Sequence, residues 1–240
     1  MDRENICKKF IFKILPNMIV LLTFIILLSL GNWQIRRLEE KQNFIETIES
    51  NLENSAKEIE TLYKPVPLYS KVKIEGKFLR GQDIFLYGRR SSFPEKDGYY
   101  LFTPFAAKNG KTYMVSRGWM PQTVKVNLTI NKDASDKMES IEAVTLPSEK
   151  RGYFVPENDV ENNVWFTMDL NIAANTRSTN VKDFYLLQIN SDNIPHGVIP
   201  LKVTYLSKVR NDHLEYAITW YALAICLLIM RGHYLYKLRK

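Results

Sequence analysis

The chain has 240 residues, 45% of them hydrophobic, which is enough for one substantial domain together with apolar helices. Its formal net charge is +7, and almost all of this excess lies in residues 1–13 and 231–240. A near-neutral body between two basic tails indicates a membrane topology and argues against nucleic-acid binding. The two cysteines, Cys7 and Cys226, lie far apart at no metal-ligand spacing. This excludes a thiol redox enzyme, a disulfide scaffold and a cysteine-based copper carrier.

The first apolar segment, residues 14–33, contains no charged side chain. Its length matches the hydrocarbon thickness of a bilayer, which predicts a transmembrane helix. The basic residues in 1–13 predict a cytoplasmic N-terminus, and Trp33 stands where an interfacial aromatic is expected. A cleaved signal peptide, with a small-residue site at Ser29-Leu30-Gly31, is the alternative. The long apolar stretch and the helical pattern that follows it favour an uncleaved anchor.

Residues 34–63 continue with a helical period. Apolar side chains recur every three or four residues, from Ile45 to Leu62. This predicts an amphipathic helix that ends before the pair Pro65 and Pro67 and packs its apolar stripe on the neighbouring domain.

From residue 68 to 210 the pattern changes to one typical of strands. Val72, Ile74 and Phe78 alternate with lysines, and Asn109-Gly110 predicts a hairpin turn. Further strands are predicted at 83–89, 99–106, 112–120, 123–130, 141–146 and 183–189, with a polar loop at 156–163 and a short helix at 171–178. The predicted fold is a membrane α+β protein whose mostly antiparallel or barrel-like outer domain lies between two transmembrane helices.

The second apolar segment, residues 213–232, has no charge between Tyr216 and Met230. Asp212 and Glu215 have the spacing of a capping box, which predicts the start of a helix. Two spans with basic ends predict a hairpin, with residues 1–13 and 233–240 in the cytoplasm and residues 34–212 outside it.

One face of this second helix carries His213 and Trp220, with Ala217 and Ala224 beside them. An ionisable ring at the end of a membrane helix indicates a functional site. Two other interpretations stay open: His and Trp favour the lipid–water interface, and an alanine stripe is often a surface for helix packing.

Antiparallel packing of the two spans would bring Trp33, Gln34, Arg36 and Arg37 to the level of Asp212, His213 and Tyr216. Neutral imidazole is a common ligand of haem iron. At that level arginines pair either with haem propionates or with lipid phosphates.

Five segments, in order along the chain, resemble the surfeit locus protein one family of cytochrome c oxidase assembly factors, bacterial type. They are GNWQIRRLEEK (31–41), GKF (76–78), GYYLFTPFAAKNGKTYMVSRGWMP (98–121), NNVWFTMD (162–169) and NDHLEYAITWYALA (211–224). The chain departs from the family pattern at Asn32 and Arg36 in the first segment and at Ile218 in the last. None of these positions is the expected ligand.

The resemblance implies a membrane protein that is not an enzyme and that helps build the haem a centres of oxidase subunit I. It implies haem a as a transient cofactor, His213 as axial ligand of the haem iron and Trp220 as pocket wall. Tyr216 and Arg37, which the packing places nearby, complete the expected cofactor-binding set. The expected partners are cytochrome c oxidase subunit I, haem a synthase and membrane lipid.

The expected location is a bacterial inner membrane with the large domain in the periplasm, or the mitochondrial inner membrane in a eukaryote. The same resemblance allows a chaperone that stabilises subunit I without touching haem. From another class, a polysaccharide chain-length regulator shares the hairpin topology. Such a scaffold would have a long helical outer domain, which the predicted strands disfavour.

Overall fold

The structure is a computed structural model that describes residues 3–59, 65–89, 96–125, 137–190, 194–202 and 211–239. The chain divides into two compact units. One consists of residues 1–47 and 209–240, and the other of residues 48–208.

The first unit consists of two helices that are both long and apolar enough to cross a membrane. Helix α1 runs from Arg3 to Glu53, so the apolar and amphipathic segments predicted from the sequence form one continuous helix. It ends earlier than the predicted end at Leu62. Lys57–Glu58 instead form a short strand, β1, because the backbone there pairs with a neighbouring strand. Helix α5 runs from His213 to Lys237 and extends beyond the predicted end at residue 232.

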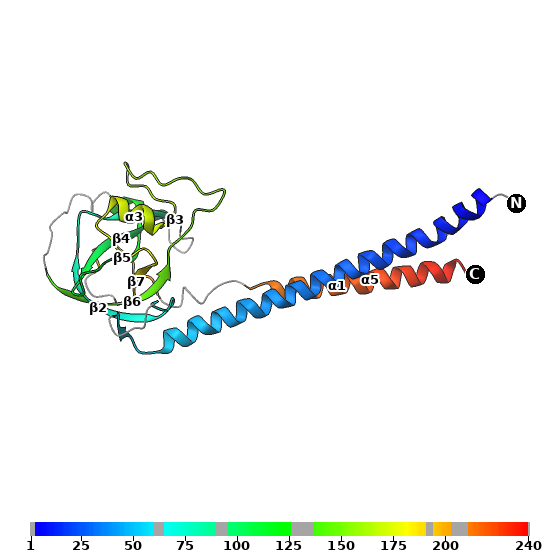
Figure 1. The fold of residues 1–240 in the computed structure, drawn as a ribbon, viewed down its shortest axis with the longest axis horizontal. Helices are drawn as coiled ribbons and strands as arrows, with labels where there is room; N and C mark the ends of the chain where they lie inside the picture. The colour runs from blue at the N-terminus through cyan, green and yellow to red at the C-terminus, as the bar shows by residue number, and fades with distance from the viewer. Residues whose placement is uncertain are drawn as a thin grey trace. The chain divides into compact units, whose positions relative to one another are not determined.

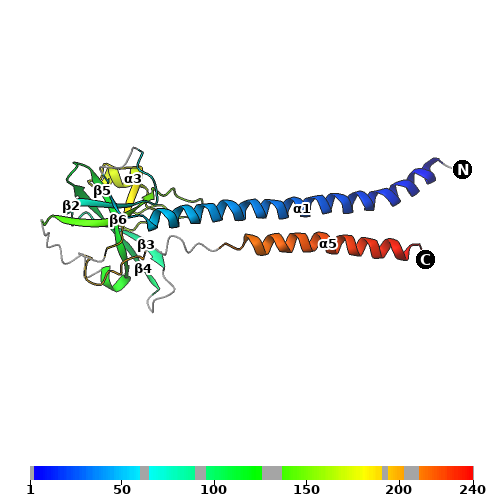
Figure 2. The same cartoon turned by 90° about the horizontal axis from the view of Figure 1, so that it is seen from below.

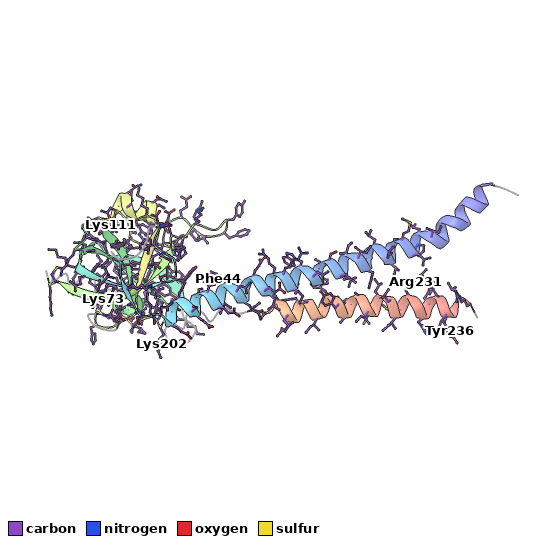
Figure 3. All side chains as sticks on the ribbon, turned by 60° about the horizontal axis from the view of Figure 1, so that its bottom comes forward. Phe44, Lys73, Lys111, Lys202, Arg231 and Tyr236 are labelled. Carbon is purple, nitrogen blue, oxygen red and sulfur yellow. The ribbon has the colours of Figure 1, made fainter. Side chains whose placement is uncertain are left out.

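The two helices lie side by side and run antiparallel (Figure 2). The hydroxyl of Tyr221 donates to Oδ1 of Asn32 at 2.7 Å. Toward the other end of α5, Nε of Arg231 donates to Oδ1 of Asn17 at 3.1 Å, from the side that faces α1 (Figure 3). A third polar contact, at His213, is described below. Together the three contacts fix the register of α5 against α1.

The second unit is built on one sheet that closes into a barrel (Figure 1). Its further strands are β2 (Lys71–Phe78), β3 (Ile84–Arg89), β4 (Asp97–Ala107), β5 (Thr112–Pro121), β6 (Glu139–Pro147) and β7 (Phe184–Gln188). The strand order is β1-β2-β6-β7-β5-β4-β3, and a further pairing of β2 with β4 closes five strands into a ring. Five strands closed in this way form the architecture of small Greek-key barrels such as the OB fold.

Most neighbouring strands run antiparallel, whereas β5 with β7 and β1 with β2 run parallel. The predicted turn at Asn109-Gly110 joins β4 to β5, and Gly110 has the positive φ of 76° that favours glycine. The predicted short helix is α3 (Leu170–Thr176), whose first turn is capped by the side chain of Asp169.

The prediction of a strand at 123–130 is wrong where the structure describes it. Residues 122–125 are helical, and residues 126–130 lie outside the described residues. Alternating apolar and polar side chains fit a strand, but Pro121 ends β5 and the following residues make a helical turn instead.

Large apolar side chains fill the barrel in adjoining clusters. One cluster contains Trp119 and Trp165 together with Ile48 and Leu52 from the end of α1. This burial confirms that the end of the long helix packs its apolar stripe on the β-rich domain. The indole of Trp119 donates to the backbone carbonyl of Gly88 at 2.8 Å, which satisfies its polar edge inside the cluster.

A charged side chain is also buried in the barrel. Arg117 on β5 is 2% exposed, and its guanidinium lies 3.9 Å from the ring centroid of Phe78. Burial lowers the pKa of Arg117 to about 10, and the nearby charge of Glu139 opposes this shift. At neutral pH the guanidinium is therefore still a cation, and Glu139, itself buried, is the nearby counter-charge.

Candidate functional site

His213, the first residue of α5, contacts the side chain of a residue on α1. Its Nδ1 lies 2.7 Å from Oε1 of Gln34. In the tautomer that carries the ring proton on Nδ1, the imidazole donates to this carbonyl oxygen. The lone pair of Nε2 is then available for a ligand, and no hydrogen-bond partner of Nε2 is found in the described part of the chain.

A shallow groove of about 290 Å³ surrounds this contact. It is lined by five side chains from the two helices: Gln34, Lys41, Asp212, His213 and Tyr216. The first two come from α1 and the other three from the start of α5. The groove therefore combines an imidazole, an amide, an ammonium, a carboxylate and a phenol within one open site.

Two of the four side chains expected at the site line this groove. His213 and Tyr216 do, although the ring of Tyr216 is largely exposed. Arg37 does not: its guanidinium donates to Glu40 at 2.8 Å and lies near the ring of Trp33. Trp220 lies two turns farther along α5, half-buried on the face that carries His213.

The alanine stripe on α5 is a surface for helix packing. Ala217 and Ala224 are each 1% exposed, and they share the side of α5 from which His213 and Tyr221 reach α1. Small side chains let two apolar helices approach closely. The packing interpretation therefore holds for the alanines.

The expected capping box is not formed. Asp212 is the residue that precedes the helix, but its side chain makes no capping hydrogen bond, and its φ and ψ are −95° and 6°. Non-extended dihedral angles turn the carboxylate away from the first N–H groups of the helix. Its side chain instead lines the groove.

Sequence reasoning placed Gln34 at the level of His213 but did not name it as a site residue, and it missed Lys41. Gln34 and Lys41 are seven residues apart on α1, a spacing that places both on one face of a helix. Such a polar pair on the face that carries Gly31 could have been recognised. Which side chain of α5 meets Gln34, however, depends on the register between two helices.

The groove residues fit part of a haem group. The fixed imidazole has the form of a metal ligand whose second nitrogen is held by an acceptor. The ammonium of Lys41 is a suitable partner for a propionate. The groove lies just below the usual volume of cofactor pockets, about 300–1,000 Å³. Gln34, Lys41 and His213 would hold one edge of such a group.

The chain has two long apolar helices, a small β-barrel, and a histidine that contacts Gln34 at the start of the second helix. It therefore belongs to a class of two-helix barrel proteins that can associate with a membrane. A sequence profile described as the SURF1 family matches residues 21–225, so the chain belongs to the SURF1 family.

Similar proteins occur in bacteria and in animals. A SURF1-like protein of Rickettsia felis is 44% identical over 215 residues, covering 89% of this chain and 94% of the relative. A SURF1-like protein of Rickettsia bellii is 43% identical over 212 residues, covering 88% of this chain and 87% of the relative. Surfeit locus protein 1 of Gallus gallus is 29% identical over 212 residues, covering 81% of this chain and 67% of the relative.

Proposed function

We propose that this protein is a membrane-anchored, non-enzymatic assembly factor for cytochrome c oxidase that holds haem a during maturation of subunit I. The observation that supports this proposal is the contact between His213 Nδ1 and Gln34 Oε1, which keeps Nε2 available as an axial ligand. Family membership is consistent with it, because the resemblance that led to the proposal covers the same motif around His213.

Each groove residue has a defined role in this proposal. Gln34 fixes the tautomer and the orientation of the His213 ring. Lys41 takes the propionate role that the sequence suggested for Arg37, because Lys41 lines the groove and Arg37 does not. Tyr216 and Trp220 offer aromatic surface along α5 for the macrocycle. Bound haem a would supply the metal centre, and this chain would supply one ligand.

A site with one protein ligand and little enclosure suits a carrier. Groups of three or more His, Cys, Asp or Glu side chains that could hold a metal ion are not found among the described residues. Haem held through His213 alone can be released by breaking one bond between the iron and the protein. A shallow groove also leaves most of the haem accessible to the acceptor protein. Subunit I is the proposed acceptor, and haem a synthase is a proposed donor.

The proposed location is a bacterial inner membrane, crossed twice, with both termini in the cytoplasm and the barrel in the periplasm. Both helices have the required length and composition. Basic residues flank their ends, and snorkelling side chains such as Arg231 suit an interface. A chain-length regulator with a long helical outer domain is not proposed, because the outer unit is a barrel.

A haem-independent chaperone of subunit I is the second candidate. The small volume of the groove favours it, because about 290 Å³ cannot enclose a whole macrocycle. In that case the helix pair and the barrel would bind subunit I directly, and the contact between His213 and Gln34 would be a structural bond.

The test is the absorption spectrum of the full-length protein, purified after co-expression with haem a synthesis. Wild type is expected to show haem a bands, and His213→Ala to lose them. His233→Ala is the matched control, because it removes an exposed histidine of the same helix. Imidazole added to His213→Ala is expected to restore part of the spectrum.

Oxidase assembly is measured in the same strains. Loss of both haem and assembly in His213→Ala supports haem transfer. Absence of haem from wild type, with assembly still dependent on the protein, refutes haem carriage and supports the chaperone.

A further inference from the structure

A loop between β6 and α3 carries two aromatic side chains that are almost fully exposed. Tyr153 is 92% and Phe154 is 94% exposed, and their ring centroids are 5.0 Å apart at 85°. The loop projects from the barrel in Figure 1, in yellow-green. Neighbouring aromatic side chains rarely remain in water without a binding role, because each forfeits the free energy of burying its surface.

The loop is held in shape by its own hydrogen bonds. Asn158 anchors its base: Nδ2 donates to the carbonyl of Thr167 at 2.9 Å, and Oδ1 accepts from the N–H groups of Phe166 at 2.8 Å and Thr167 at 3.1 Å. Nearer the tip, Arg151 pairs with Glu157 at 3.3 Å. The aromatic pair is thus presented on an ordered support.

The same barrel has a groove of about 1,210 Å³ elsewhere on its surface. Its walls are mostly apolar, and two lysines, Lys111 and Lys182, lie among its lining residues. The apolar lining includes Val66, Pro67, Leu68, Tyr113, Val181 and Phe184. Asp183 also lines the groove, which therefore offers apolar surface with a net charge of +1.

We propose that Tyr153 and Phe154 of one copy insert into this groove of a second copy. The net charges are opposite: the loop of residues 148–163 has more acidic than basic side chains, including the exposed Glu157 and Glu161, and the groove has Lys111 and Lys182 against the single acid Asp183. In Figure 3, Lys111 lies on the side of the barrel away from the projecting loop. Each copy would give its loop to one neighbour and its groove to another, which makes rings or rows.

The acidic character of the loop is also why a second copy is preferred to a bilayer surface. Anionic leaflets attract segments rich in lysine and arginine. The loop of residues 148–163 carries four acidic side chains against two basic ones, Lys150 and Arg151, and its net charge of −2 disfavours binding to such a surface.

The expected contact is weak in dilute solution. Two aromatic side chains bury about 150–250 Å² each, well below the roughly 1,200–2,000 Å² total of a standard stable interface. Two-dimensional confinement raises the effective concentration of neighbouring copies. Association should therefore appear in membranes at high density, and this step alone rests on the proposed membrane anchoring.

The experiment replaces Phe154 with a photo-cross-linking phenylalanine in the full-length protein and irradiates native membranes. The expected product is a covalent dimer, with the attachment mapped by mass spectrometry to residues 65–68 or 181–184. Because the side chain at position 154 is almost fully exposed, the probe should leave folding unchanged, which a thermal melt verifies. A lack of dimer, attachment to lipid only, or attachment outside the groove would overturn the proposal.

A complementation test establishes the direction of the contact. One copy has a disabled groove, Leu68→Glu with Lys182→Glu, and carries the probe at position 154. The other copy has a disabled tip, Tyr153→Ser with Phe154→Ser, and an intact groove. The first copy alone should give no dimer, whereas the mixture should give only the mixed dimer. If the groove-disabled copy cross-links to itself as wild type does, the groove is not the partner.

Measuring the haem spectrum of these variants distinguishes failure of the docking proposal from failure of the proposed haem binding. The tip and groove residues belong to the barrel, and His213 belongs to the helix unit. Cross-linking can therefore fail while the haem spectrum persists, or persist in a protein that binds no haem.

Discussion

His213 Nδ1 and Gln34 Oε1 lie 2.7 Å apart, so a side chain of α1 contacts the ring at the start of α5. In a metal-binding site, such an outer contact orients the ligand and keeps its other nitrogen unprotonated. The relationship makes Gln34 a positioning residue of the proposed site.

Replacement of Gln34 by Leu is expected to weaken haem affinity about 10- to 100-fold, the usual effect of losing such a partner. The measurement is a haem titration followed by absorption, which also reports the axial ligand through band positions. Asn32→Leu is the control, because Asn32 bonds Tyr221 instead and lies outside the groove. Unchanged affinity in Gln34→Leu would show that the contact is only structural.

Gly31 and Gly232 should respond to alanine with opposite signs. A Cβ at Gly31 would lie 2.5 Å from Cε1 of Tyr221, whereas a Cβ at Gly232 would meet nothing within 4 Å. Gly31→Ala should destabilise the helix pair by about 1–3 kcal/mol through overpacking. Gly232→Ala should stabilise it by about 0.5–1 kcal/mol through helix propensity.

Thermal unfolding in one detergent compares the two glycine variants. Adding Tyr221→Ala to Gly31→Ala should remove the overpacking and recover much of the loss. Equal shifts for both glycines would contradict the close approach of Gly31 to Tyr221.

Arg117→Met should destabilise the barrel, because it removes the buried cation beside the carboxylate of Glu139 and leaves only Arg80, 3.9 Å away. The loss should stay below the about 3–5 kcal/mol of a fully broken buried pair. The double variant Arg117→Met with Glu139→Gln should recover most of this loss, because neither buried charge then remains. Chemical denaturation measures both. Similar losses in the single and the double variant would mean that the packing of Arg117 on Phe78 matters more than charge.

Asn158→Ala should loosen the projecting loop while leaving the barrel folded. It removes three hydrogen bonds at the base of the loop, each worth about 0.5–1.5 kcal/mol. Limited trypsin digestion should cut faster after Lys150 and Arg151 than in wild type. Asn158→Asp keeps the acceptor and should give an intermediate rate. An unchanged rate would show that the bonds of Asn158 do not hold the loop.

Much of the fold could be predicted from the sequence because its signals are local. The uncharged runs at residues 14–33 and 216–230 indicate the two long helices by length and composition alone. The period-two pattern from Val72 to Phe78 gives β2, whose side chains alternate between buried and less buried positions. Asn109-Gly110 gives the turn between β4 and β5. In each case neighbouring residues carry the whole signal.

The ends of elements were predicted less well. The apolar period continues to Leu62, but α1 stops at Glu53 and β1 follows, because a backbone partner on β2 outweighs local helical preference. The predicted strand from residue 123 begins instead as a helical turn. Both differences depend on contacts made by residues distant in sequence.

The sequence by itself determined two apolar helices, a strand-rich domain between them, and a histidine beside an alanine stripe. Only the tertiary structure decided that β2 pairs with β4 to close the barrel, and that His213 meets Gln34 while Arg37 turns to Glu40. The physical reason is that periodicity tells which face of an element is buried, whereas the partner and the register on that face depend on packing between segments far apart in the chain.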